Sequence, residues 1–206
     1  MMEYTAFIIA SVALTLMPGP DILYVITESI TRGKRYGITI ALGLVSGLIF
    51  HTALVATGVG LFIQQTDWLY QVIKLAGVAY LCYLAYLATK EEKSPPQDAI
   101  QIETQSEYNF GSLYRRGITM NVLNPKVTIF FLAFLPGFVN QEADNPILQI
   151  CILGLIFMTQ AIVIFISVSY LADQLGQLLK LKRFWSILYW FRIGVLLGIS
   201  VLLLLT

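Results

Sequence analysis

Long apolar stretches alternate with short polar connections along this chain of 206 residues. A membrane-spanning helix needs about 20 consecutive, mostly apolar residues, and six stretches reach that length. The pattern therefore predicts an all-α integral membrane protein with six transmembrane helices. The six stretches are residues 5–27, 37–63, 69–89, 113–139, 147–171 and 184–205.

A polar segment, from about residue 90 to residue 112, divides the chain into two halves. It contains no apolar run that is long enough to insert into a bilayer. Because each half has three predicted helices, the second half enters the membrane with the opposite orientation, as in inverted-repeat transporters. We therefore expect a single membrane domain over residues 1–206, made of repeat 1 (about 5–89), a cytoplasmic linker and repeat 2 (about 113–206).

The basic residues predict the orientation of the helices, because cytoplasmic connections carry an excess of Lys and Arg. The first, third and fifth connections with their flanks are basic, whereas the second and fourth connections and both termini carry no Lys or Arg. We therefore expect both termini to be extracytoplasmic. The basic residues concerned are Arg32, Lys34, Arg35, Lys90, Lys93, Arg115, Arg116, Lys180, Lys182 and Arg183.

The first apolar stretch contains the run Met17-Pro18-Gly19-Pro20-Asp21. Proline removes a backbone donor and its ring clashes with the carbonyl one turn earlier, so we expect the first helix to be broken here. Irregular backbone in a membrane is tolerated where it is buried in protein or lines a wet cavity. An ionisable group in a membrane, such as Asp21, indicates a functional site. We therefore place substrate contacts at Pro18, Gly19, Pro20 and Asp21.

The fourth stretch contains a similar pattern, because Pro125-Lys126 matches Pro20-Asp21 and predicts a second broken helix. Each charge lies eleven residues from a basic flank. At 1.5 Å per residue, both charges are roughly 16 Å from that flank and near the middle of a hydrocarbon core about 30 Å thick. They form either a structural ion pair between the halves or a site for the ammonium and carboxylate of a zwitterion.

Four more polar residues lie inside apolar stretches. Asn121 and Asn124 precede the second break, and they either cap it or contact the ligand together with Pro125 and Lys126. His51 is the only histidine, and it either relays protons or, as we favour, makes a hydrogen bond between helices. Arg192 is expected to face the interior of the bundle. Together with Asp21, His51 and Arg192 are the candidates for proton coupling.

Composition and motifs exclude several classes of protein. Charged residues are 12% of the chain, against about 25% in soluble domains. The net charge of +1 gives no reason to expect a nucleic-acid partner. The two cysteines form no CxxC motif, and the chain contains no hydrolytic, metal-binding or nucleotide-binding motif. We therefore expect neither an enzyme nor a metal, a cofactor or ATP-driven transport.

Several short motifs follow one another in a specific order along nearly the whole chain. Together they resemble the LysE/RhtB family of amino-acid exporters, although each motif alone has little specificity. The motifs are Met17-Pro18-Gly19-Pro20-Asp21, Arg32-Gly33, the glycines Gly37, Gly43 and Gly47, Gly77 with Tyr80-Leu81, Gly117 with Asn121-Val122-Leu123-Asn124-Pro125-Lys126, and Phe134-Leu135-Pro136-Gly137-Phe138.

The resemblance implies a secondary transporter of the bacterial inner membrane that exports amino acids by proton antiport, with a homo-oligomer as an option. Lysine and arginine exporters of the family have Gly-Pro-Gln-Asn where this chain has Gly19-Pro20-Asp21-Ile22. The expected substrates are therefore small neutral amino acids or derivatives, such as homoserine, threonine or leucine. Gly137, where many members have Gln, and Ala85, where Gly is frequent, depart from the family pattern. The alternatives are a channel-like pore, a transporter of another small solute and a membrane scaffold without transport activity.

Overall fold

The computed structural model describes residues 2–59, 62, 65–90, 109–140, 145–175 and 182–205. All regular structure in these ranges is helical, which confirms the all-α class. Most of the predicted linker, residues 91–108, lies outside the described ranges. The elements are α1 (Met2–Leu16), α2 (Pro20–Arg32), α3 (Lys34–Leu54), the π-helical turn η1 (Val55–Val59), α5 (Asp67–Lys90), α7 (Phe110–Val122), α8 (Pro125–Ile129), the π-helical turn η2 (Phe130–Phe134), the 3₁₀-helix η3 (Leu135–Phe138), α9 (Pro146–Leu175) and α10 (Lys182–Leu205).

The first predicted span consists of two helices separated at the proline run. α1 ends at Leu16, and α2 begins at Pro20 after Gly19, whose backbone is extended. The two helices are bent by 54°. Pro20 suits the first position of α2, because the N–H group that it lacks would have no partner within the helix. The break therefore lies where the sequence predicts it.

The fourth predicted span is also broken, at Pro125. α7 ends at Val122, and the pair formed with Pro125–Phe138 is bent by 49°. Asn124 precedes α8, and its side-chain Oδ1 accepts a hydrogen bond from the backbone N–H of Lys126 at 3.1 Å. Both breaks thus have the same construction, with proline at the first helical position and a charged residue at the second.

The lengths of the described helices support three to five membrane spans. Three helices are long and apolar enough by themselves: Lys34–Gly58, Trp68–Lys90 and Pro146–Gln174. Two more spans result if each bent pair is one span. α10 lies at the sixth predicted stretch, but its described apolar part, Tyr189–Leu204, is shorter than a span of about 20 residues. Six spans in inverted repeats therefore stay a prediction.

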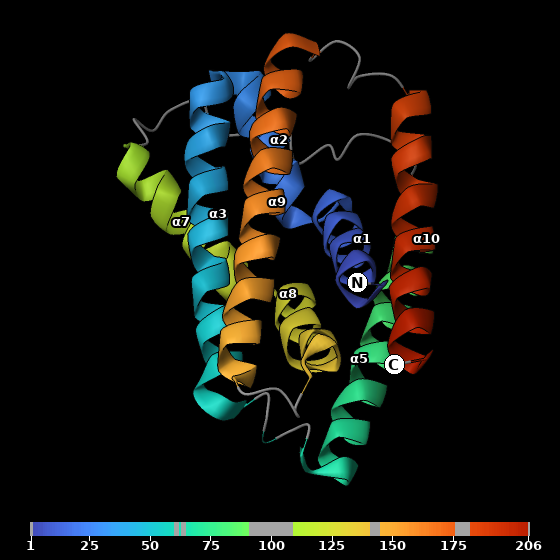
Figure 1. The fold of residues 1–206 in the computed structure, drawn as a ribbon. Coiled ribbons are helices and arrows are strands. Elements are labelled where there is room, and N and C mark those ends of the chain that lie inside the picture. The colour runs from blue at the N-terminus through green and yellow to red at the C-terminus, as the bar shows by residue number, and fades with distance from the viewer. Residues whose placement is uncertain are drawn as a thin grey trace.

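The helices run between two ends of one bundle (Figure 1). α2 ends and α3 begins at the upper end, where α9 also ends and α10 begins, whereas α3 ends and α5 and α9 begin at the lower end. α5 and α10 lie side by side, and α3 packs between α7 and α9. α3 and α10 thus run from the upper to the lower end, and α9 runs in the opposite direction.

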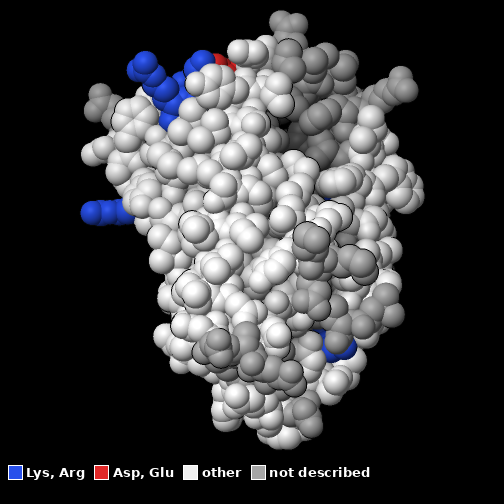
Figure 2. All heavy atoms as spheres, viewed as in Figure 1, with Lys and Arg blue, Asp and Glu red and all other residues white. Residues whose placement is uncertain are grey.

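The surface has the character of a membrane protein. On the face in Figure 2, basic side chains gather near the upper end, where α2 ends and α3 begins, and charged side chains are rare below it. Large apolar side chains point outward in the uncharged zone; Ile49 is 58% exposed and Leu155 is 61% exposed. Apolar exposure of this extent is rare in soluble monomers and marks contact with a membrane or a partner.

Glycines allow α3 and α7 to approach each other closely. A Cβ atom on Gly117 would lie 2.6 Å from the carbonyl oxygen of Ile40, and a Cβ atom on Gly43 would clash with the carbonyl oxygen of Tyr114. Small residues permit such backbone approach between membrane helices. One turn further, a Cβ atom on Gly47 would lie 2.7 Å from Cβ of Asn121. This packing positions the Asn121 side chain.

Candidate functional site

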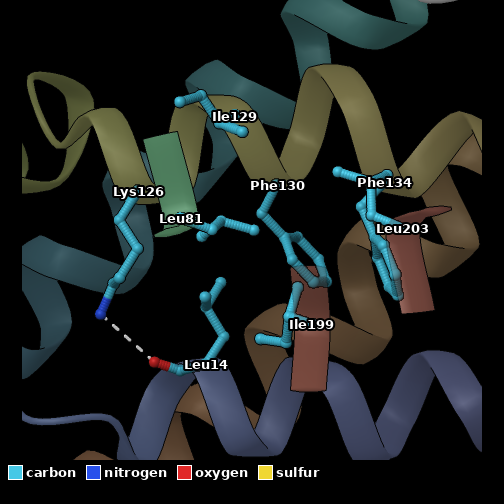
Figure 3. A pocket seen from close by; sticks show the side chains of 8 residues that line it. All are labelled: Leu14, Leu81, Lys126, Ile129, Phe130, Phe134, Ile199 and Leu203. Atoms are coloured by element: carbon cyan, nitrogen blue, oxygen red, sulfur yellow. Dashed lines mark hydrogen bonds between the residues drawn. The ribbon is translucent and has the colours of Figure 1, made fainter. Parts of the chain in front are cut away.

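At each helix break, one backbone carbonyl lacks the donor that a continuous α-helix would supply. In an α-helix the N–H group of residue i donates a hydrogen bond to the carbonyl of residue i−4. Pro18 and Pro125 have no N–H group, so they cannot donate to the carbonyls of Leu14 and Asn121. The ammonium of Lys126 donates a hydrogen bond to the Leu14 carbonyl at 3.2 Å, as Figure 3 shows. A side chain of the second half therefore completes the break in the first half.

In the second half, the Asn121 carbonyl accepts a hydrogen bond from the backbone N–H of Asn124 at 3.0 Å, and a side chain of the first half approaches the same oxygen. Nε2 of His51 lies 3.1 Å from the carbonyl oxygen of Asn121. Because a carbonyl only accepts hydrogen bonds, Nε2 carries the proton and donates it. His51 is fully buried, and its ring contacts the Phe131 ring at a centroid distance of 5.5 Å. The structure thus favours an interhelical hydrogen bond as the role of His51.

Asn124 connects the two breaks. Its Nδ2 donates a hydrogen bond to Oδ2 of Asp21 at 2.6 Å, while its Oδ1 caps α8. Asp21 lies in the first turn of α2, where the helix dipole favours a negative charge. Asn124 therefore caps the second break and holds the Asp21 carboxylate, whereas its contact with a ligand stays a prediction.

Asp21 and Lys126 share one cavity but do not form a direct ion pair. Neither side chain makes an N···O contact within 4 Å with the other; Asp21 bonds Asn124, and Lys126 bonds the Leu14 carbonyl. The ammonium of Lys126 lies against Gly19, 3.5 Å from the place where a Cβ atom would be. Asp21 and Lys126 are 5% and 9% exposed. A permanent structural ion pair is therefore absent from this conformation.

The shared cavity has a volume of about 20 Å³ and is lined by Asp21, Asn121, Lys126 and Thr15 together with apolar side chains of α1, α3, α8 and α9. A cavity of this size holds about one water molecule. A free amino acid is several times larger. The cavity in this conformation is therefore too small to hold a free amino acid.

Two acceptor atoms of residues that line the cavity lack hydrogen-bond donors. Oδ1 of Asp21 and Oδ1 of Asn121 are buried and receive no hydrogen bond from any described residue. A buried acceptor without a donor costs about 1–3 kcal/mol, so these atoms favour a ligand that supplies N–H groups. Lys126, which makes one hydrogen bond to the protein, offers the complementary donor for an anion.

The sequence analysis did not identify Gln160 and Thr15 as neighbours of the site. Nε2 of Gln160 donates a hydrogen bond to Oγ1 of Thr15 at 3.0 Å, and Oε1 of Gln160 is buried without a donor among the described residues. Thr15 lines the cavity. An amide deep inside the fifth apolar stretch was the signal in the sequence that could have indicated Gln160.

Glu28 is a second residue that the sequence analysis missed. Its side chain is 1% exposed, and its Oε2 lies 3.4 Å from Nε of Arg32. Glu28 follows Asp21 by two helical turns on the same face of α2. An acidic residue directly after the first apolar stretch, two helical turns from Asp21, was the signal in the sequence that could have indicated Glu28.

The other predicted site residues have different positions. Pro18 and Gly19 are buried in the first break, whereas Pro20 and Pro125 are exposed. Arg192 is half-buried in α10 and does not line the cavity, although it is near enough for its charge to act on Lys126. Among the described residues, no cluster of His, Cys, Asp and Glu could hold a metal ion.

Comparison with known proteins places the chain among membrane translocators. The sequence model of the family "LysE type translocator" matches residues 12–206. The homoserine/homoserine lactone efflux protein of Salmonella typhimurium is 28% identical over 176 residues, which are 85% of this chain and 82% of that protein. The leucine efflux protein of the same organism is 27% identical over 173 residues, which are 82% of this chain and 77% of that protein.

A third relative, an uncharacterized membrane protein of Vibrio cholerae, is 28% identical over 178 residues, 86% of this chain and 84% of that protein. No solved structure matches the chain. The matches with the two efflux proteins and with the family model all extend over most of the chain. Both helix breaks lie within the residues that the family model covers.

Proposed function

Because the chain belongs to the LysE type translocator family, we propose that it is a secondary transporter that exports small neutral amino acids or their derivatives from the cytoplasm. Two relatives carry the names homoserine and leucine efflux protein, and the proposal extends this substrate class to the present chain. Its bilayer is the bacterial inner membrane, with both termini outside and the odd-numbered connections in the cytoplasm.

The observation that carries the proposal is the pair of opposite charges at one buried cavity between the two breaks. Asp21 and Asn121 offer acceptor atoms without donors, which suit the ammonium group of an amino acid. Lys126 offers a cation to its carboxylate. Burial of either charge alone is costly, so a ligand that carries both charges is stabilised here.

The same arrangement supports antiport with protons. Asp21 lines the cavity, so a proton and the substrate ammonium would compete for one carboxylate. Competition of this kind couples the binding of the proton to the release of the substrate, and the binding of the substrate to the release of the proton. Arg192 stays charged in proteins and therefore serves as a carboxylate partner better than as a proton carrier. His51 does not line the cavity, and we assign to it the support of the second break.

Export requires the closed site to open to each side in turn. In inverted-repeat transporters, broken helices near the middle of the membrane form the substrate site, and one group of helices moves against the other. We propose that α1–α2 and α7–α8 are these broken helices. The six-span topology predicted from the sequence provides the matching halves.

Efflux from proteoliposomes tests this function. Purified protein is reconstituted into vesicles that are loaded with single radiolabelled amino acids, and efflux is followed with and without a pH gradient. We expect export of neutral amino acids that a proton gradient accelerates and a protonophore slows. Efflux that never proceeds against a substrate gradient would instead identify a channel-like pore. Absence of flux for every amino acid tested would exclude this substrate class.

A further inference from the structure

A second, apolar cavity lies next to the polar one. Its volume is about 10 Å³, and seven of the eight side chains that line it are aliphatic or aromatic. Among them, Leu81 comes from α5, Phe134 from η2, and Ile199 and Leu203 from α10 (Figure 3). The eighth is Lys126, whose ammonium points away from the apolar side chains toward the Leu14 carbonyl. The lining therefore offers no side-chain hydrogen-bond partner to a hydroxyl group.

The two cavities meet at Leu14 and Lys126, which line both. The polar cavity is lined by the α1, α2, α3, α7, α8 and α9 helices, whereas α5 and α10 contribute side chains to the apolar cavity alone. An amino acid carries its ammonium, its carboxylate and its side chain on one carbon atom. A molecule whose charged groups lie between Asp21 and Lys126 thus has the apolar cavity within reach of its side chain.

We propose that the apolar cavity is a side-chain subsite that selects aliphatic amino acids, such as leucine, isoleucine, valine and methionine, over hydroxylated ones, such as homoserine and threonine. This proposal rests on the proposed function and narrows its substrate class. Burial of an aliphatic side chain among Leu81, Ile199 and Leu203 removes apolar surface from water. A buried hydroxyl there would lose its hydrogen bonds to water without replacement. We expect a preference for leucine over homoserine of at least about 10-fold.

The subsite widens together with the polar cavity, because 10 Å³ does not hold an aliphatic side chain. α5 and α10 pack chiefly against each other and less against the rest of the bundle. A movement of this pair away from α1 and α8 would enlarge the apolar cavity and leave the contacts within the pair intact. The side chains of α5 and α10 then determine which substrates are accepted.

Binding measurements on purified protein test the subsite separately from transport. Competition against radiolabelled leucine yields the affinities of leucine, homoserine and glycine; glycine has the charged groups and no side chain. The variant Leu81→Asn places an amide in the subsite at a similar volume, and Leu84→Asn on the same helix is the matched control, because Leu84 does not line the cavity. A second variant, Leu203→Phe, fills the cavity with an apolar group.

We expect Leu81→Asn to reduce the preference for leucine over homoserine at least about 5-fold and to leave glycine affinity unchanged, while Leu84→Asn keeps the wild-type preference. Leu203→Phe should weaken leucine binding and spare glycine. Equal affinities of the wild type for leucine and homoserine, or a preference that neither lining variant alters, would overturn the subsite and leave the proposed function intact. If none of the three amino acids binds, the proposed function itself fails.

Discussion

Neutralisation of Asp21 is the most direct test of the charged site. In the wild type, Nδ2 of Asn124 donates a hydrogen bond to the Asp21 carboxylate at 2.6 Å. In Asp21→Asn, the amide oxygen of the new side chain can still accept this hydrogen bond. A hydrogen bond to a charged group contributes about 1.5–3 kcal/mol and one between neutral groups about 0.5–1.5 kcal/mol, so the loss is about 1 kcal/mol. Loss of one member of a direct buried ion pair costs about 3–5 kcal/mol.

That larger cost does not apply in full, because Lys126 keeps its hydrogen bond to the Leu14 carbonyl and forms no direct ion pair with Asp21. We therefore expect Asp21→Asn to lower the free energy of unfolding by about 1–3 kcal/mol. The decrease in export should be larger than this decrease in the free energy of unfolding explains. A substrate ammonium that loses a charged partner binds about 10-fold to 100-fold more weakly, since 1.4 kcal/mol corresponds to a factor of ten.

Export and stability are measured on the same preparations. Thermal unfolding in detergent reports the stability, and efflux from proteoliposomes with equal amounts of protein reports the transport. Asp173→Asn is the matched control, because it makes the same chemical change at an exposed position of α9. Normal export by both Asp21→Asn and Lys126→Met would refute the role of these charges.

The charge exchange Asp21→Lys with Lys126→Asp separates a structural role from recognition. In the wild type, the carboxylate lies at the start of α2 and the ammonium at the last carbonyls of α1, and both positions suit the helix dipoles. A purely structural pair should regain folding and export after the exchange. A pair that binds substrate or carries protons should regain folding alone. Recovery of both properties would contradict our proposal.

Three further predictions concern positions around the site. His51→Gln keeps a donor for the Asn121 carbonyl and should preserve export and its pH profile. His51→Phe removes the donor and should destabilise the protein by about 1–3 kcal/mol. A changed pH profile of export by His51→Gln would indicate that His51 transfers protons. Gly47→Ala should displace Asn121 and impair export. The control Gly198→Ala, whose Cβ atom would meet open space, should be tolerated. Equal effects of the two variants on export would argue against a role of Gly47 in positioning Asn121. A single cysteine at Gln101 should resist an impermeant reagent added outside intact cells, and its labelling would reverse the predicted topology.

The sequence predicted the helical class, the stretches and both breaks because these depend on local properties. Apolar runs of sufficient length form helices that bury their backbone polar groups, and proline interrupts a helix wherever it stands. The Pro-charge pairs at residues 20–21 and 125–126 were therefore readable without a structure. The prediction that Asp21 and Lys126 lie at equal depth rests on the constant rise of a helix.

Only the tertiary structure decided how the two breaks complete each other. The residues that bond there are far apart in the chain: Lys126 and Leu14, His51 and the Asn121 carbonyl, Asn124 and Asp21. Periodicity indicates which face of a helix is buried but not which partner covers it. For the same reason, the sequence did not indicate that Gln160 lies near the polar cavity or that α5 and α10 line an apolar cavity together with α1, α8 and η2. The sequence by itself thus determined where the helices break, because proline acts locally, and it predicts that two charges lie near the middle of the membrane. Packing between distant segments determined which atoms meet at the breaks.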